Sequence, residues 1–246
     1  MPSDLRTLQK LIRSHGDPEK ARFLAGFFRT GPGQYAEGDR LLGITVPTQR
    51  RIAAMYAHLP SIDLQDLIKS PWHEERLISL LILTHQFEAA LKAKDLTKAE
   101  NIVHLYLANT RYINNWDLVD LSAYKILGRW HWLQNRDTKH LLLLAHSTHL
   151  WEKRIAIVST YFFIRSNDLS PTLEIATILL TDRHDLIHKA VGWMLREVGK
   201  RDRATLDAFL EKHCRQMPRT MLRYAIERYP EPERKKYLNA KTTDAL

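Results

Sequence analysis

The sequence has little of what marks several protein classes. Its 246 residues include one cysteine, Cys214, and no CxxC pattern. A lone cysteine cannot form an internal disulfide, and a zinc site built from thiolates would need further cysteines. Nine glycines and ten prolines are too few for a collagen-like or low-complexity chain. These counts exclude disulfide scaffolds, zinc fingers and fibrous proteins.

Long hydrophobic runs are also missing. The longest strictly apolar stretch has about five residues, near Leu141 to Ala145, whereas a membrane-spanning helix needs about 20. The segment MPSDLRTLQKLIRSH carries Asp4 early and has the pattern of an amphipathic helix. It lacks the continuous apolar core and the small-residue cleavage site of a secretory signal. We therefore expect a cytoplasmic protein that has no membrane partner.

Positive charge is in excess, and it is unevenly distributed. The chain has 37 basic and 28 acidic residues, which gives a net charge of +9. Residues 1–60 carry 9 basic and 5 acidic side chains, residues 61–181 carry 13 of each, and residues 182–246 carry 15 and 10. Such an excess is typical of proteins that bind polyanions. A solvated basic surface without a partner is the alternative.

Signals for β-structure are nearly absent. No Asn-Gly or Asp-Gly turn joins two alternating runs, whereas apolar residues recur with a period of about 3.6 throughout the chain. The pattern predicts an all-α protein. From proline and capping positions we expect helices to begin near Asp4, Pro18, Pro47, Ser61, Pro71, Lys98, Asn115, Lys139, Leu150, Ser170, Asp185, Arg203, Pro218 and Pro230.

Three stretches of the chain are weakly similar to one another. SPWHEERLISLLIL, THLWEKRIAIVSTY and HDLIHKAVGWMLRE place Arg76, Arg154 and Lys189 at the same helical turn, 78 and then 35 residues apart. With NNWDLVDLSAYKIL midway in the longer gap, the unit has about 35 to 40 residues, the period of HEAT-type helix pairs. This predicts a superhelical solenoid of antiparallel helix pairs with a concave basic surface, which suits duplex nucleic acid. An ordinary helical bundle is the alternative.

Two local patterns lack the residues that phosphate or metal chemistry needs. The irregular segment TGPGQYAEGDRLLG, Thr30 to Gly43, has no GK[ST] ending and carries two acidic residues. It is a lid, a wedge or a packed connector. His184 and His188 lack the glutamate of HExxH and a third ligand, so they flank a helix start. We expect neither a metal nor a cofactor, and no Ser/His/Asp or Cys/His arrangement supports a nucleophile.

The helix expected from Asp185 to about Lys200 has two contrasting faces. Its apolar face consists of Ile187, Val191, Met194 and Val198. The opposite face consists of Lys189, Trp193, Arg196 and Lys200. Cations with an aromatic platform between them are typical of nucleic-acid binding, although Trp193 could instead pack on a neighbouring repeat.

A second tryptophan is paired with a carboxylate. Trp116 and Asp120 are four residues apart and share one helix face with Ala123 and Leu127. Apolar surroundings disfavour an ionised carboxylate unless a positive charge lies nearby. Arg154, Arg196 or a cationic substrate could supply that charge. A structural Asp–Arg bridge between repeats is the alternative.

Together, the helices that carry NNWDLVD, WEKRIAIV and HKAVGWMLRE resemble the AlkD-type DNA alkylation repair glycosylases, which are built from HEAT-like repeats. The resemblance extends in the same order from PEKARFLAGFF through LLGITVP to MPRTMLRYAIER. It therefore covers most of the chain. We expect a single domain over residues 1–236 and a C-terminal tail over residues 237–246.

The resemblance implies a monomeric, monofunctional glycosylase acting on duplex DNA. Its substrates would be cationic alkylated purines such as N3-methyladenine and N7-methylguanine, cleaved without flipping the base into a pocket. Asp120 would be the catalytic carboxylate, and Trp116 and Trp193 would flank the deoxyribose of the lesion. Arg154 and Arg196 would hold the phosphate backbone.

Further DNA contacts are expected around this centre. We place Lys189, Arg219 and Arg223 on inner helices that face the phosphates. Phe27 stands where some family members have an aromatic hydroxyl, and Tyr35 in the nearby irregular segment could compensate. The alternatives are a non-catalytic HEAT-like module that binds DNA or RNA and, more weakly supported, a protein-interaction scaffold. Asp120 between two tryptophans favours the enzyme, because phosphate binding alone has no use for a carboxylate.

Overall fold

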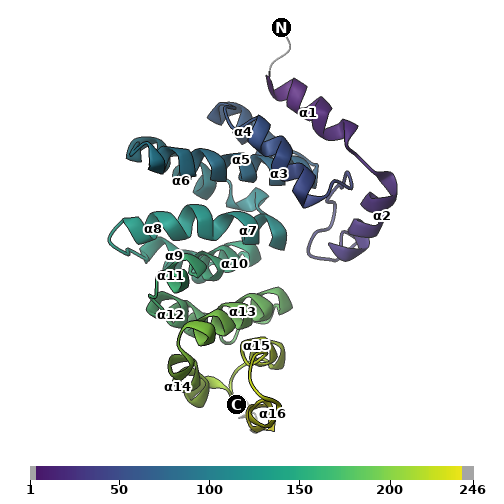
Figure 1. Cartoon of the computed structure of the whole chain (residues 1–246). Coiled ribbons are helices and arrows are strands. Elements are labelled where there is room, and N and C mark those ends of the chain that lie inside the picture. Colours follow the sequence, from purple (N-terminus) through teal and green to yellow (C-terminus); the bar gives the residue numbers. More distant parts are fainter. Residues whose placement is uncertain (1–3, 240–246) are drawn as a thin grey trace. The chain divides into compact units, whose positions relative to one another are not determined.

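The computed structural model describes residues 4–239. Within this range the chain forms α-helices α1 to α16 and no β-strand (Figure 1). One isolated bridge of parallel type pairs Arg40 with Trp72. The all-α prediction is therefore confirmed. The chain divides into two compact units, one up to Ser122 and one from Ala123 onward.

The first unit is organised around one long helix. Its elements are α1 (Asp4–Ser14), α2 (Pro18–Phe27), α3 (Val46–Met55), α4 (Ser61–Ile68), α5 (His73–Lys92), α6 (Leu96–Ala108), the 3₁₀-helix η1 (Thr110–Tyr112) and α7 (Trp116–Ala123), whose last residue lies past the unit boundary. Helix α5 packs against α1, α3, α4 and α6. It carries buried residues on every side, as expected for a helix surrounded by others.

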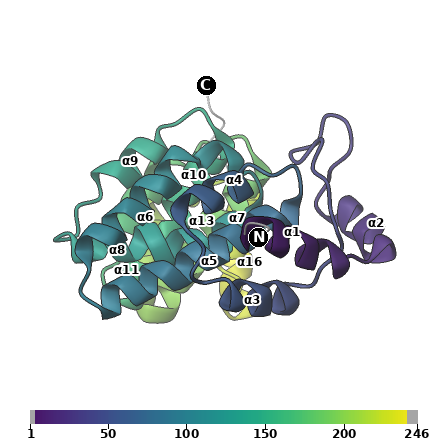
Figure 2. The same cartoon turned by 90° about the horizontal axis from the view of Figure 1, so that it is seen from above.

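Helix α2 stands at the side of the first unit (Figure 1 and Figure 2). The Asp17 carboxylate caps it by accepting from the backbone N–H groups of Glu19 and Lys20, each at 3.1 Å. None of its residues is buried. Phe23 and Phe27 are 72% and 55% exposed although both are large and apolar. This helix therefore presents aromatic side chains to solvent.

The second unit is organised around α13. Its elements are the π-helix η2 (Tyr124–Gly128), α8 (Arg129–Leu133), α9 (Lys139–Ala145), α10 (Leu150–Ser159), α11 (Tyr161–Arg165), α12 (Ser170–Ile178), α13 (Asp185–Arg201), α14 (Arg203–His213), α15 (Arg219–Ala225) and α16 (Glu231–Asn239). Helix α13 packs against α10, α11, α12, α14 and α15. At Gly192 a Cβ would lie 2.5 Å from the Met221 carbonyl oxygen, so glycine permits the close approach of α13 and α15.

Each predicted helix start lies within two residues of an observed one. Helix α6 begins at Leu96 rather than Lys98, because the Asp95 side chain caps it by accepting from the Lys98 N–H at 2.9 Å. The sequence did not predict α8, α11 or η2. Each has five residues and directly follows another helical segment or its cap, so its apolar pattern merges with that of its neighbour.

The predicted domain boundaries stay a prediction. Of the expected tail at 237–246, residues 237–239 belong to α16. Residues 240–246 lie outside the described range.

Candidate functional site

The N-terminus of α7 positions two of the predicted site residues. The Asn115 side chain accepts from the backbone N–H of Trp116 at 2.8 Å, and the Asp117 carboxylate accepts from that of Leu118 at 2.9 Å. These contacts satisfy N–H groups that a helix start leaves without partners. Trp116 is therefore the first residue of α7 and Asp120 follows one turn later. Both side chains are half-buried.

Trp116 belongs to an aromatic cluster. The Phe28 ring stacks on it with centroids 5.3 Å apart and an interplanar angle of 30°, and the Phe27 ring meets it edge-on at 5.6 Å. The structure thus brings together two predicted site residues, Phe27 and Trp116. Sequence reasoning missed Phe28, which is 7% exposed. The Phe-Phe pair at 27–28 is the only sequence signal for it.

A buried histidine lies next to this aromatic cluster. The His73 ring is 4.7 Å from that of Phe28. Its Nε2 is 2.8 Å from an Asp117 carboxylate oxygen, and its Nδ1 is 3.0 Å from an Asp39 carboxylate oxygen. Burial alone would lower the pKa of His73, but the charges and hydrogen bonds of Asp117 and Asp39 outweigh it and raise the pKa to about 9. His73 is therefore an imidazolium at neutral pH.

An arginine completes this buried network. The Arg76 guanidinium pairs with Asp39 and donates to the Ser70 carbonyl oxygen at 3.0 Å. Burial would raise the pKa of the Asp39 carboxyl, but His73 and Arg76 hold it below its usual value. We call Asp39, His73, Arg76 and Asp117 the buried charge network. The sequence did not predict these connections. It indicated Arg76 only as a repeat position, and Asp39 is one of the two acidic residues of the irregular segment.

The C-terminal end of the irregular segment Thr30 to Gly43 is anchored to the first turn of α5. The segment contains no helix or strand, and Asp39 within it belongs to the buried charge network. Near its end, the Glu74 carboxylate accepts from the backbone N–H groups of Leu42, Gly43 and Ile44 at 2.7 to 3.2 Å. Gly43 has φ of 82°, and a Cβ there would lie 2.2 Å from the Asp17 carbonyl oxygen. This part of the segment is therefore a packed connector.

The remaining first-unit predictions concern Tyr35 and Asp120. Tyr35 is half-buried in the same irregular segment. The charge of Asp120 affects the pKa of Tyr106, a fully buried residue whose hydroxyl is 2.9 Å from the Ser122 hydroxyl. Burial raises the pKa of Tyr106, and the negative charge of Asp120 raises it further. The carboxylate of Asp120 therefore influences the protein interior while remaining partly open to solvent.

In the second unit, α13 has the two faces that its sequence predicts. Ile187, Val191, Met194 and Val198 are all fully buried, which confirms the core face. On the other face Lys189, Trp193 and Arg196 are half-buried and Lys200 is exposed. The Trp193 ring lies 6.0 Å from that of Tyr161 in α11, a residue that sequence reasoning missed.

The cations on this face have carboxylate partners. Lys189 Nζ is 2.6 Å from an Asp185 oxygen, and Lys200 Nζ is 2.8 Å from a Glu197 oxygen. Arg196 pairs with Glu227, whose side chain is 48% exposed. A phosphate that approached Arg196 would therefore compete with a carboxylate that is already about half exposed to solvent.

The other three predicted arginines differ in exposure. Arg154 is 5% exposed, and its Nη1 donates to the Leu186 carbonyl oxygen at 2.6 Å, which ties α10 to the start of α13. Arg219 is exposed, and its Nη2 donates to the Leu238 carbonyl oxygen at 2.5 Å. Arg223 is exposed on α15.

The histidine pair at the start of α13 has the predicted structural role. The His184 side chain accepts from the Leu186 N–H at 3.1 Å and caps the helix, and His188 Nε2 is 2.5 Å from the Asp182 carbonyl oxygen. Residues 4–239 contain no group of three or more His, Cys, Asp or Glu side chains arranged to hold a metal ion. No helix among these residues is long and apolar enough to cross a membrane.

Comparison with protein families identifies one family. The family model described as DNA alkylation repair enzyme matches residues 8–229. Among solved structures, a predicted DNA alkylation repair enzyme from Enterococcus faecalis superposes with a TM-score of 0.68 at 15% sequence identity. The match covers 88% of this chain and 98% of that one, and at this identity it shows a shared fold. No curated protein matches the chain.

Proposed function

Because the chain belongs to the DNA alkylation repair enzyme family, we propose that it is a DNA glycosylase of base excision repair. It hydrolyses the N-glycosidic bond of cationic alkylated purines, such as N3-methyladenine and N7-methylguanine, in duplex DNA. It acts as a monomer without a cofactor, in the cytoplasm and on the nucleoid. The observation that carries the proposal is the half-buried Asp120 one turn after Trp116, on a helix start fixed by buried charges.

The chemistry needs one carboxylate. An alkylated purine already carries a positive charge, so the base leaves as a neutral molecule and the sugar becomes an oxocarbenium ion. Asp120 stabilises this cation and orients the water that attacks it, and the tryptophan faces present negative quadrupole to the sugar. At about 4 Å an opposite charge gains about 4 kcal/mol at an effective dielectric constant of 20, against about 1 kcal/mol in water. The half-buried position of Asp120 supports this role.

The basic side chains of the second unit bind the phosphates. We assign this role to Arg154, Lys189, Arg196, Arg219 and Arg223, on a concave surface of a solenoid of HEAT-like helix pairs. Two observations support this assignment. Arg219 and Arg223 are exposed, and the polar face of α13 is partly open to solvent. Arg154 also holds the start of α13 through its bond to Leu186, so its effect on DNA binding combines direct contact with the placement of α13.

Selection follows from the lability of a cationic base rather than from its shape. In this mechanism Trp116, Asp120 and Trp193 contact the deoxyribose, and the base is not read in a pocket as in enzymes that flip nucleotides. Neutral lesions are then left intact, whereas cationic purines with adducts of different size are cleaved.

One assay tests the proposal. Purified protein is incubated with three duplexes that carry 7-methylguanine, a bulky cationic N3-substituted adenine or hypoxanthine, and the released bases are measured. We expect release of both cationic purines and no release of hypoxanthine. Efficient hypoxanthine release or strict rejection of the bulky adduct would contradict the mechanism. Tight DNA binding without release of any base would favour the non-catalytic module instead.

A further inference from the structure

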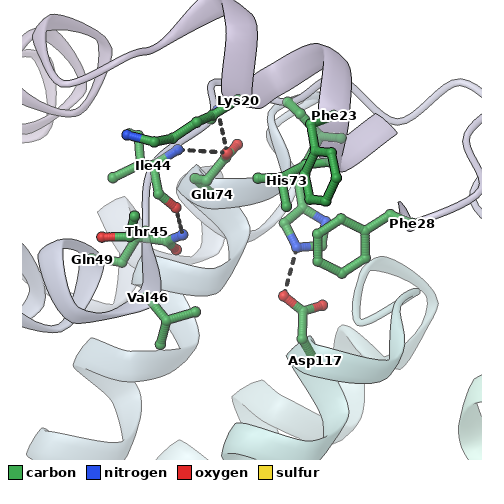
Figure 3. A pocket seen from close by; sticks show the side chains of 13 residues that line it. Lys20, Phe23, Phe28, Ile44, Thr45, Val46, Gln49, His73, Glu74 and Asp117 are labelled. Carbon is green, nitrogen blue, oxygen red and sulfur yellow. Dashed lines mark hydrogen bonds and ion pairs between the residues drawn. The ribbon is translucent and has the colours of Figure 1, made fainter. Parts of the chain in front are cut away.

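A cavity of about 360 Å³ lies inside the first unit, beside α2 and the start of α3 (Figure 3). Its volume falls within the range of small-molecule sites, roughly 300 to 1,000 Å³. Most of its wall is apolar and consists of Phe23, Leu24, Phe28, Leu41, Ile44 and Val46. Figure 3 shows the two phenylalanine rings on one side and Ile44, Val46 and Gln49 on the other. The function proposed above does not use this space.

One buried polar atom on the wall lacks a partner. Gln49 is 3% exposed, and its Nε2 donates to the Ile44 carbonyl oxygen at 2.7 Å. Its Oε1 is buried and has no hydrogen-bond partner among the described residues. A buried acceptor of this kind is unfavourable unless a ligand or a water supplies a donor. The cavity therefore provides a hydrogen-bond acceptor for a molecule that carries an N–H or O–H group.

The charges around the cavity favour a neutral occupant. His73 and Asp117 line the cavity and pair with each other, and both belong to the buried charge network, in which two carboxylates are balanced by two cations. The Glu74 carboxylate accepts hydrogen bonds from three backbone N–H groups. The only lysine or arginine on the wall is Lys20, whose ammonium is 3.0 Å from an Asp17 oxygen. A phosphate would find no cluster of cations here. A cation would meet carboxylates that already pair with His73 or accept from three backbone N–H groups.

We propose that this cavity binds a free, neutral purine base or a heterocycle of the same chemistry. The flat ring packs between the aromatic and aliphatic walls, and one of its N–H groups donates to Gln49 Oε1. Purine bases combine an aromatic face with N–H donors and carry no phosphate, which matches the apolar wall and the unpartnered acceptor of Gln49.

The source of such a ligand rests on the proposed function. In the glycosylase reaction the water oxygen bonds to the sugar carbon C1′, and the electron pair of the broken bond stays with the base. The water proton passes to solvent. A cationic 7-methylguanine nucleotide thus releases neutral 7-methylguanine. The cavity accepts the product of this reaction and excludes its cationic, sugar-linked substrate, which agrees with a mechanism that does not flip the lesion.

Calorimetric titration of the full chain with free 7-methylguanine tests the proposal. We expect saturable binding, and no binding of the cationic nucleoside 7-methylguanosine. Val46→Trp fills the cavity and should weaken binding at least about tenfold. Met55→Trp adds the same side chain to the same helix at a position that is 64% exposed and outside the wall. This control should bind within about twofold of the parent protein.

A second variant keeps the proposal testable if Val46→Trp does not fold. Gln49→Leu removes the acceptor without filling the cavity, and it should weaken binding at least about fivefold. Absence of saturable binding to the folded parent protein would overturn the proposal, as would equal binding of 7-methylguanosine. The titration contains no DNA, so its outcome is independent of base excision. If the protein excises bases but does not bind the free base, only the proposed ligand of the cavity is refuted. If it binds the free base but excises none, only the proposed glycosylase activity is refuted.

Discussion

In the first unit the charged groups beside the predicted active-site tryptophan are buried, whereas in the second unit those on the predicted phosphate-binding helix reach solvent. The side chains of His73 and Asp117 are 2% and 8% exposed, and those of Arg196 and Glu227 are 18% and 48% exposed. Both pairs join a cation to a carboxylate. Their surroundings differ, and so do the consequences of breaking them.

A buried pair is difficult to exchange, because either partner alone would be a charge without solvation. The His73–Asp117 contact therefore fixes the N-terminus of α7, and with it the placement of Trp116 and Asp120. An exposed pair contributes little to stability, since water and salt screen it. The Arg196–Glu227 contact can therefore be replaced by a phosphate at small cost. Of these two pairs, the buried one holds a helix start in position, and the more exposed one can exchange its partner.

The largest effect should come from removing the buried cation. His73→Gln leaves the carboxylates of Asp39 and Asp117 with Arg76 as their only buried cation, and breaking a buried pair in this way costs about 3 to 5 kcal/mol. We expect a loss of this size in the free energy of unfolding at pH 7, measured by urea denaturation. A change below about 1 kcal/mol would show that this contact contributes no more to stability than an exposed ion pair does.

The parent protein supplies a second measurement should this variant fail to fold. The pKa of His73 is raised in the folded state to about 9, from an ordinary value of about 6.5. The stabilisation is fully present below about pH 6.5 and is lost as the pH rises through about 9, because the unfolded chain releases the proton first. Unfolding free energies should therefore fall between pH 7 and pH 10. A flat profile over this range would contradict the assigned role of His73.

The second prediction concerns the half-buried carboxylate that these charges position. Asp120→Asn should preserve folding and DNA affinity but lower excision of 7-methylguanine by roughly 10² to 10³, the scale for losing one preorganised electrostatic group. Single-turnover kinetics measure the effect, and circular dichroism with DNA titration provides the control. Unchanged excision would assign Asp120 a structural role.

The contrast between the units also explains how much could be predicted from the sequence. Helix α13 has 17 residues, long enough for its periodic pattern to separate a core face from a polar face, and the structure confirms both. The buried charge network could not be predicted, because His73 is 34 residues from Asp39 and 44 from Asp117. Only the tertiary fold brings such distant residues together. The positions of Trp116 and Asp120 on one helix were predictable from their spacing, whereas the stacking of Phe28 on Trp116 was not.

The third prediction tests the cations that we assign to phosphate binding. Each phosphate contact contributes about 0.9 to the slope of log K against log salt concentration, so Arg196→Gln should flatten that slope by about one. Arg136→Gln is a matched control in the same unit, since Arg136 is exposed, stacks on Trp132 and has no predicted DNA contact. Fluorescence anisotropy at several salt concentrations measures both. If neutralising Arg154, Lys189, Arg196, Arg219 and Arg223 in turn leaves the slope unchanged, the DNA binds to another surface.

The smallest effect should come from removing a carboxylate partner of Arg196. Glu227→Gln removes one of two carboxylates near Arg196, the other being Glu197 with an oxygen 3.6 Å from the arginine Nε. Because exposed pairs are worth less than about 1 kcal/mol, DNA should bind up to about fivefold more tightly. Glu233→Gln removes the same charge from the same unit at a similarly exposed side chain, but its partner is Arg203, which has no predicted DNA contact. Both variants lower the negative charge of the unit by one, so the difference between their affinities isolates the loss of the Arg196–Glu227 pair. Equal affinities would attribute any gain to net charge alone, and weaker binding by Glu227→Gln would show that the pair holds Arg196 in its binding position. That last result would give the Arg196–Glu227 pair the positioning role that the His73–Asp117 pair has in the first unit.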